Sequence, residues 1–276
     1  MFNFNKTSEF LLCIDSDGTI MDSMTIKHNK CFGPAFIEIF NIQTNQKEIL
    51  NHWNKVNLYS KTRGINRFQG LLEILEYVKK YNIYFDGFEE YKSWVLNTKE
   101  LSEKSLANEI KNVSKNNLLN LALSWSRKVN LSIKGLPVAS PFNGVKDAII
   151  ELNEVADLLG VSSANFDAVD HEWSKHNIKK YFKVVACQDS GTKSKIIRNA
   201  LCLGYDRKLT LMVGDALGDY EAAKENGVYF FPIIPKREVY SWKKLKDEGI
   251  KKLVNYQFDD NYQKQILDEF LDSLSK

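Results

Sequence analysis

The sequence predicts an α/β protein with a doubly wound parallel sheet and a helical domain inserted after the first strand. Three observations predict this fold. A short apolar run over residues 10–14 stops at Asp15, as buried parallel strands do where they reach their C-terminal loops. The long stretch that follows carries apolar side chains at helical spacing. From residue 145 onward, helical patterns alternate with apolar strand patterns, which is typical of a parallel sheet.

The elements of the sheet domain follow one another in a regular order. Strands are expected over residues 10–14, 156–161, 183–186, 209–213 and 228–234. Four helices are expected between these strands. They run from residue 145 to about 154, through Trp173 after the second strand, from 193 to 203, and, after the fourth strand, to an end at Gly227. The first strand must join this sheet, because a single strand cannot bury itself. Two amphipathic helices are expected in the tail, around residues 239–246 and 262–274.

The insertion shows helical spacing over residues 68–78, 88–95 and 118–125. Asp86, with Glu89 three residues later, is expected to cap the second of these helices. Chain-breaking residues then cluster, namely Gly135, Pro137, Pro141 and Gly144. We therefore predict an α/β core over residues 1–21 and 138–276, and a helical domain over residues 22–137.

Composition excludes several classes of protein. The chain has 276 residues, 43% of them hydrophobic, and a formal charge of +3, far from the concentrated positive field that nucleic-acid binding requires. It lacks a signal-peptide pattern and any apolar run long enough to span a bilayer. We expect a cytoplasmic monomer or weak homodimer that binds neither nucleic acid nor membranes. The four cysteines are interpreted as reduced core residues.

The sequence DSDGT follows the first strand. If the extended geometry persists, Asp15 and Asp17 project to the same side, where one carboxylate can attack phosphorus while the other transfers a proton. Gly18 then lets the backbone approach a phosphate. An Asp-Gly turn is the alternative interpretation, and a calcium loop is excluded because glycine and glutamate are missing from the required positions.

Three further sites follow later strands. Asp215 and Asp219 come after residues 209–213, and Asp15 with Asp215 supplies the oxygen ligands that Mg²⁺ prefers. Asp219 is either a ligand or a charge that complements the dipole of a helix over residues 220–226. Ser162 and Ser163 end the strand at 156–161, where they form an anion site or an ordinary helix cap.

Lys193 is expected at the N-terminus of a helix, where a cation is unfavourable unless it pairs with an anion; a solvated surface lysine is the alternative. The four sites all lie at the C-terminal ends of predicted strands or in the loops after them, and ligands bind at that edge of open α/β sheets.

In order along the chain, IDSDGT, the strand end at Ser162, Lys193 and GDALGD resemble the four motifs of the haloacid dehalogenase-like hydrolase superfamily. The resemblance covers the whole Rossmann-like core, and the inserted helices are similar to that superfamily's cap. It implies Asp15 as nucleophile and Asp17 as general acid and then base, with Ser162 and Lys193 binding the phosphoryl group. It also implies Mg²⁺ on Asp15, Asp215 and the backbone carbonyl of Asp17, with Asp219 at the last acidic position.

Members that cleave carbon–halogen bonds lack the second aspartate of the first motif, so Asp17 favours hydrolysis of a phosphate monoester on a small phosphorylated metabolite. A phosphomutase and a catalytically idle binding module are the alternatives. Arg63 and Arg67, in the helical domain, are either contacts for the substrate's leaving group or solvated surface charges.

Overall fold

The computed structural model describes residues 2, 4–112 and 117–274 of the chain. The chain divides into two compact units. One comprises Met1–Met24 with Val138–Lys276, and the other comprises Thr25–Pro137. The sequence-based division placed these boundaries after residues 21 and 137.

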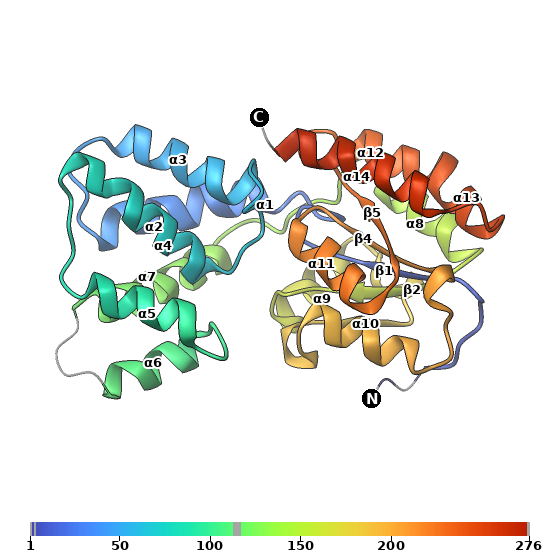
Figure 1. Cartoon of the computed structure of the whole chain (residues 1–276), viewed down its shortest axis with the longest axis horizontal. Coiled ribbons are helices and arrows are strands. Elements are labelled where there is room, and N and C mark those ends of the chain that lie inside the picture. Colours follow the sequence, from blue (N-terminus) through green and yellow to red (C-terminus); the bar gives the residue numbers. More distant parts are fainter. Residues whose placement is uncertain (1, 3, 113–116, 275–276) are drawn as a thin grey trace. The chain divides into compact units, whose positions relative to one another are not determined.

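In the described residues of the first unit, five strands form one sheet, shown in Figure 1. Its strands are β1 (Leu11–Ile14), β2 (Asp157–Val161), β3 (Val184–Ala186), β4 (Thr210–Gly214) and β5 (Tyr229–Pro232). All neighbouring strands pair in parallel, in the order β3-β2-β1-β4-β5. The predicted doubly wound α/β fold is confirmed.

The strand order places a topological switch point beside β1. The chain moves outward from β1 to β2 and β3, and then returns to the other side of β1 to form β4 and β5. Crossovers therefore diverge on the two sides of β1, and ligands in such sheets bind in the crevice at the C-terminal ends of the strands that flank this point. Asp15 directly follows β1 and Asp215 directly follows β4, so both aspartates lie at this point.

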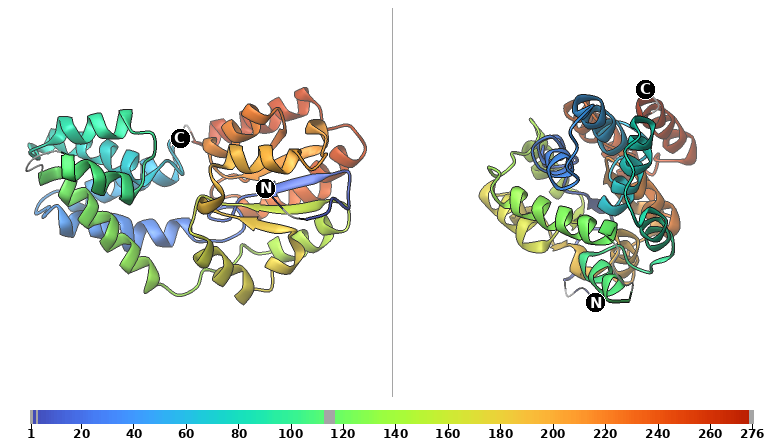
Figure 2. Two further views of the ribbon diagram at one scale, coloured as in Figure 1. Left: turned by 90° about the horizontal axis from the view of Figure 1, so that it is seen from below. Right: turned by 90° about the vertical axis from the view of Figure 1, so that its left-hand side faces the viewer.

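Helices cover both faces of the sheet (Figure 2). These are α8 (Val145–Asn153), α9 (Phe166–Lys175), α10 (Lys193–Leu201), α11 (Leu217–Asn226), α12 (Glu238–Lys244), α13 (Ile250–Val254) and α14 (Asp260–Leu274). Leu12 and Ile14 of β1 pack in one apolar cluster with residues of α8 and α12, whereas Leu11 and Cys13 pack in a second with residues of α10 and α11. Burial on both faces explains why β1 is a continuous apolar run.

The tail contains more elements than predicted. The first predicted tail helix ends at Lys244, and a π-helical turn (Leu245–Gly249) and α13 then follow before α14. Gly249 permits this close packing, because a Cβ there would lie 2.7 Å from the ring of Phe231. Helix α14 packs along β5, the edge strand, and Gln263 Oε1 accepts a hydrogen bond from the Phe230 amide. The tail therefore covers an edge that would otherwise present unpaired backbone groups.

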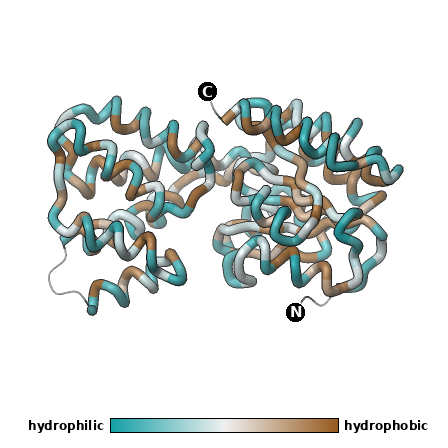
Figure 3. The backbone as a smooth tube through the Cα atoms, in the orientation of Figure 1, coloured by the Kyte–Doolittle hydropathy of each residue, from teal (hydrophilic) through white to brown (hydrophobic). Residues whose placement is uncertain are grey.

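The second unit is helical. Its elements are a π-helical turn (His28–Phe32) after α1 (Met24–Lys27), then α2 (Gly33–Ile39), α3 (Gln46–Leu58), α4 (Arg67–Val78), α5 (Phe88–Asn97), α6 (Glu103–Asn112) and α7 (Asn117–Lys134). In Figure 3, apolar residues recur along these helices between polar ones, and Trp53, Phe68 and Trp125 are fully buried. The predicted all-helical insertion is confirmed.

Two local predictions were wrong. The N-cap of α5 is Gly87, at φ 89°, and not Asp86, because the chain enters this helix through a left-handed residue that glycine adopts without strain. Cys202 is exposed beyond the end of α10, whereas the other three cysteines are buried as predicted. Along the residues that the structure describes, no helix combines the length and apolarity needed to cross a membrane.

Candidate active site

The loop after β1 is a compact turn. The Asp15 amide still donates to the Val213 carbonyl (3.0 Å), but the Ser16 carbonyl then accepts hydrogen bonds from the amides of Thr19, Ile20 and Met21. Gly18 adopts φ 79°. The expected extended geometry through Asp17 is therefore wrong, because the backbone folds back onto the Ser16 carbonyl immediately after Asp15. The Gly18 amide donates to Met21, so its contact with a substrate stays a prediction.

Three carboxyl groups converge beside this loop. Asp15, Asp215 and Asp219 each offer an oxygen, and these oxygens lie within 4.8 Å of one another. The three residues are 4%, 2% and 0% exposed. They come from the ends of β1 and β4 and from the first turn of α11, so the fold brings together residues that lie about two hundred positions apart in the sequence.

Lys193 pairs with this cluster. Its Nζ lies 2.7 Å from Asp15 Oδ1 and 2.5 Å from Asp219 Oδ1, and its side chain is 16% exposed. Lys193 is the first residue of α10, whose N-cap Thr192 accepts a hydrogen bond from the Lys195 amide. The alternative of a solvated surface lysine is excluded, and a cation at the start of a helix is explained by two buried carboxylates.

Burial and the neighbouring charges shift the pKa values of the residues in this cluster. Burial raises the pKa of Asp15 well above its usual range; repulsion from Asp219 and Asp215 adds to this, and the ammonium of Lys193 opposes it. The pKa of Asp219 is raised for the same first reason. Burial alone would lower the pKa of Lys193, but its attraction to Asp15 and Asp219 outweighs this and raises it, so Lys193 stays charged.

Asp219 occupies the first turn of α11. This helix begins at Leu217, three residues earlier than the predicted one, and Asp219 Oδ2 accepts a hydrogen bond from the Ala216 amide at the N-cap (3.1 Å). Its other oxygen binds Lys193. Gly214 gives this carboxyl group its space, because a Cβ there would lie 2.3 Å from the Asp219 carboxyl carbon. Each of its oxygens therefore accepts one hydrogen bond, which favours a role in positioning Lys193 and capping the helix.

Sequence reasoning missed two hydroxyl groups of the same loop. Thr19 Oγ1 lies 3.3 Å from Asp15 Oδ2 and 3.2 Å from Asp215 Oδ1, so one buried hydroxyl links two of the carboxylates. The Ser23 hydroxyl donates a hydrogen bond to Asp17 Oδ1 and thereby orients that side chain. Thr19 lies inside the DSDGT motif, so a hydroxyl four residues after an aspartate was the signal available in the sequence.

Ser162 and Ser163 lie at the same edge of the sheet, after β2. The Ser162 side chain is buried and its Oγ accepts a hydrogen bond from the Ala164 amide (3.1 Å), whereas Ser163 is exposed. The next helix, α9, begins only at Phe166 and is capped by Asn165. We had expected Ser162 at the start of a helix. This prediction was wrong, because a short turn separates Ser162 from α9. Its contact with a phosphoryl group stays a prediction.

The two arginines form hydrogen bonds within the helical unit. Arg63 is 4% exposed and donates to the Leu58 carbonyl (2.7 Å). Arg67 donates to Ser126 Oγ (3.0 Å) and Asn130 Oδ1 (2.7 Å). Neither side chain is a solvated surface charge, since both are packed inside this unit. Their assignment to the substrate stays a prediction.

Solved structures resemble this fold. A haloacid dehalogenase-like family protein from Streptococcus pneumoniae is 14% identical, with a TM-score of 0.52, over 90% of this chain and 98% of that one. A predicted phosphoglycolate phosphatase from Haemophilus somnus is 15% identical, with a TM-score of 0.52, over 82% and 86% of the two chains. These similarities support the fold alone.

A search of curated protein sequences finds no significant match. The family model for haloacid dehalogenase-like hydrolases matches residues 87–233, more than half of the chain. The match contains Ser162, Lys193, Asp215 and Asp219, and it begins after Asp15, which the fold places beside them. The chain therefore belongs to the haloacid dehalogenase-like hydrolase family.

Proposed function

We propose that the protein is a magnesium-dependent phosphatase that hydrolyses a monoester of a small phosphorylated metabolite through an aspartyl-phosphate on Asp15. The observation that carries this proposal is the ion pair of Lys193 with Asp15 and Asp219, beside Asp215. It assembles a carboxylate nucleophile and a fixed cation at the switch point of the sheet, which is where a phosphoryl group needs both.

In the first step, a carboxylate oxygen of Asp15 bonds to phosphorus while the bond from phosphorus to the ester oxygen breaks. Asp17 gives its proton to that leaving oxygen. The Ser23 hydroxyl fixes the orientation of the Asp17 carboxyl group. In the second step, Asp17 accepts a proton from the water that attacks phosphorus, which releases inorganic phosphate and restores Asp15. Lys193 stabilises the charge on the phosphoryl oxygens throughout.

The donor set fits a hard divalent cation. Asp15, Asp215 and Asp219 carry three negative charges when ionised, against the single positive charge of Lys193, and all three carboxyl groups are buried. Asp15 and Asp215, with the Asp17 backbone carbonyl, would bind Mg²⁺; Asp219 would either join them through a remaining lone pair or position Lys193. Bound magnesium supplies positive charge that polarises the phosphoryl group.

Asp17 favours phosphate-ester chemistry over dehalogenation, because proton transfer to an ester oxygen requires a second carboxyl group and displacement of a halide does not. A small metabolite in the cytoplasm, a monomeric or weakly dimeric state and a lack of nucleic-acid or membrane partners belong to the same proposal. The lack of a nucleic-acid partner rests on the near-neutral charge of the sequence, and the lack of a membrane partner rests on the absence of a long apolar run in it.

The test is phosphate release from a panel of sugar, polyol and nucleotide monophosphates, with magnesium and then with chelator. We expect release that stops with chelator, returns with Mg²⁺ and is inhibited by Ca²⁺, whose looser shell disturbs in-line attack. Activity that persists in chelator contradicts the metal assignment. Retention of phosphate on an isomerised sugar supports a phosphomutase instead, and binding without turnover supports an idle module.

A further inference from the structure

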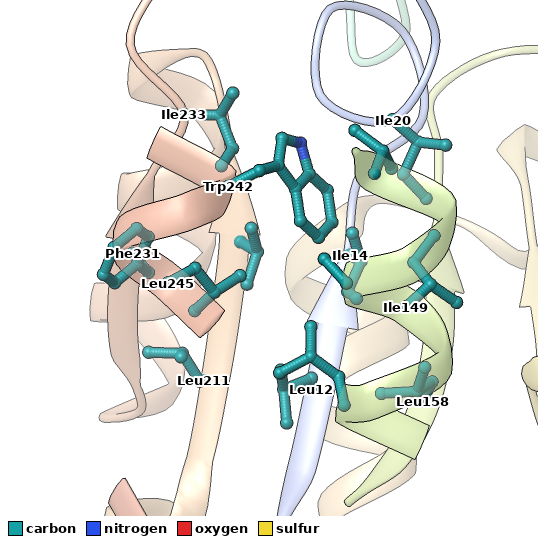
Figure 4. Packing of buried hydrophobic residues seen from close by; sticks show 14 of the residues in the cluster. Leu12, Ile14, Ile20, Ile149, Leu158, Leu211, Phe231, Ile233, Trp242 and Leu245 are labelled. Carbon is teal, nitrogen blue, oxygen red and sulfur yellow. The ribbon is translucent and has the colours of Figure 1, made fainter. Parts of the chain in front are cut away.

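Trp242, in the C-terminal tail, contacts the loop that contains the nucleophile. It lies on α12 and is 1% exposed, and its Nε1 donates a 2.8 Å hydrogen bond to the Thr19 carbonyl. Figure 4 shows its ring reaching from α12 toward Ile14 and Ile20, in the packed layer that also contains Ile149 of α8. The tail is more than two hundred residues from Thr19 in sequence, so this bond depends entirely on the fold.

The residue that Trp242 contacts is the one that links two carboxylates. Thr19 is completely buried, and its hydroxyl lies between Asp15 Oδ2 and Asp215 Oδ1. A hydroxyl has one hydrogen to donate, so Thr19 can donate to only one of the two carboxylates at a time, and its oxygen lies at nearly the same distance from both. The carbonyl and the hydroxyl belong to one residue, so a hydrogen bond that restrains the carbonyl also restrains the backbone from which the Thr19 hydroxyl projects.

Helix α12 is itself firmly anchored, so it provides a stable base for Trp242. The Ile234 amide, just beyond β5, donates to Ser241 Oγ (3.0 Å). Arg237 and Lys244 both pair with Glu269 of α14, each at 2.9 Å. The position of Trp242 is thus set by β5 on one side and by α14 on the other.

A different tryptophan fixes the beginning of the loop. Trp173 of α9 donates from Nε1 to Ser16 Oγ (3.0 Å), and its ring lies over Gly160, where a Cβ would approach to 2.9 Å. Ser16 also supplies the carbonyl that accepts the three amides of the turn. Two indoles from distant parts of the chain therefore secure the loop, Trp173 at Ser16 and Trp242 at Thr19.

We propose that Trp242 is a positioning residue for catalysis: through the Thr19 carbonyl it sets the place of the Thr19 hydroxyl and, through it, the relative position of Asp15 and Asp215. This inference rests on the proposed phosphatase function for its kinetic consequence, and on the hydrogen bonds alone for its structural consequence. It also assigns a purpose to the tail, for which the sequence suggested none.

The test variant is Trp242→Phe, which removes the N–H donor and keeps an aromatic ring. The matched control is Trp125→Phe, because Trp125 is equally buried and its Nε1 also donates to a backbone carbonyl, that of Phe32 (3.2 Å), within the helical unit. Should Trp242→Phe fail to fold, site-specific replacement of Trp242 by benzothienylalanine keeps the ring shape and replaces the N–H by sulfur. Hydrogen exchange and the kinetics of hydrolysis can both be measured on either of these two Trp242 variants.

The first readout needs no activity. Hydrogen exchange at the amides of Thr19, Ile20 and Met21, which donate to Ser16, should be about tenfold faster or more in Trp242→Phe than in wild type, because the buried Thr19 carbonyl loses its donor. Trp125→Phe should leave these amides at the wild-type rate. Unchanged exchange in Trp242→Phe overturns the proposal.

The second readout is hydrolysis of an aryl phosphate with Mg²⁺, well below the melting temperature of each variant. For Trp242→Phe we expect kcat to fall about tenfold to a hundredfold, because small displacements of reacting groups have effects of this size, while KM changes little because Trp242 is only 1% exposed. Wild-type kcat despite faster exchange also overturns the proposal, because the tryptophan would then be structural only. If wild type releases no phosphate, the proposed function fails, and the exchange comparison alone still decides whether Trp242 fixes the loop.

Discussion

Replacing Lys193 by methionine removes the cation from a buried cluster of carboxylates. Lys193 Nζ lies 2.7 Å from Asp15 Oδ1 and 2.5 Å from Asp219 Oδ1, and methionine keeps a similar apolar length without the charge. Asp15 and Asp219 then lose their ammonium partner, with the carboxyl group of Asp215 still beside them. The substitution therefore tests whether Lys193 is the main charge that stabilises this cluster in the protein without metal.

The expected loss of stability in Lys193→Met is large, because the ion pair that it removes is buried. Removing one partner of a buried ion pair costs about 3 to 5 kcal/mol, because the remaining charge stays buried. For a unit of this size, each kcal/mol lowers the melting temperature by about 2 to 4 °C, so we expect a decrease of about 10 °C in chelator at neutral pH. Phosphate release should be abolished in the same variant, since the phosphoryl oxygens lose their fixed cation.

The effect should depend on pH with a definite sign. Burial raises the pKa values of Asp15 and Asp219 in the folded protein above their ordinary values. A carboxyl group with a raised folded pKa stabilises the fold below its unfolded pKa, about 3.9, and this contribution is lost as the pH rises through the folded pKa. Without Lys193 the loss is larger, so the difference in melting temperature from wild type should widen with rising pH.

The assay is thermal unfolding across pH in chelator, with two comparison variants. Lys195→Met removes an exposed lysine from the same helix and should change the melting temperature little. Lys193→Met combined with Asp219→Asn removes one charge of each sign and should be more stable than Lys193→Met alone. A Lys193→Met protein as stable as wild type, or a double variant no more stable than the single one, would refute the electrostatic account.

Three other predictions follow. Asp17→Asn should slow turnover by about 10² to 10⁴ and let phosphoenzyme accumulate from a substrate with a good leaving group; absence of accumulation in rapid-quench mass spectrometry counts against its role as base. Burial alone would raise the pKa of Asp157, but hydrogen bonds, first that of Thr7, outweigh it and lower the pKa to about 2. Asp157 should thus contribute about 2 kcal/mol of stability above pH 4, and this contribution should be lost as the pH falls through 2. Asp157→Asn should remove this acid dependence from thermal unfolding curves. An unchanged acid dependence in the variant would contradict the prediction. Arg67→Ala should destabilise the helical unit by about 1 to 3 kcal/mol in chemical denaturation, since Ser126 loses a charged partner; wild-type stability with a raised KM for the physiological substrate would instead support substrate contact.

Much of the fold was predictable from local pattern. The run that ends at Asp15 and the run that ends before Asp215 are apolar because β1 and β4 are buried on both faces, and such runs are visible without tertiary information. Parallel strands align their C-terminal ends, so residues that follow each strand must meet. The convergence of Asp15 and Asp215 follows from that rule, although the distance between them does not, and the place of Lys193 depends also on the turn that connects β3 to α10.

Contacts that depend on tertiary packing were not predictable. Thr19 lies within the motif, but its place between two carboxylates requires the turn around the Ser16 carbonyl, and we had expected an extended chain there. Trp242 has the ordinary pattern of a buried helical residue, and nothing local connects it to Thr19. The N-cap of α5 at Gly87 depends on its left-handed backbone conformation, which the sequence does not show, and the neighbouring Asp86 suggested a different cap.

Identification of the residue that becomes phosphorylated tests the central claim most directly. The Asp17→Asn protein is incubated with magnesium and a phosphate monoester carrying a good leaving group, quenched in acid, digested and mapped by mass spectrometry. The account predicts one phosphoryl group on the peptide that contains Asp15, fragmentation that places it on Asp15, and none after the additional change Asp15→Asn. Phosphate found on another residue, or turnover near the wild-type rate in the single variant Asp15→Asn, would contradict the account.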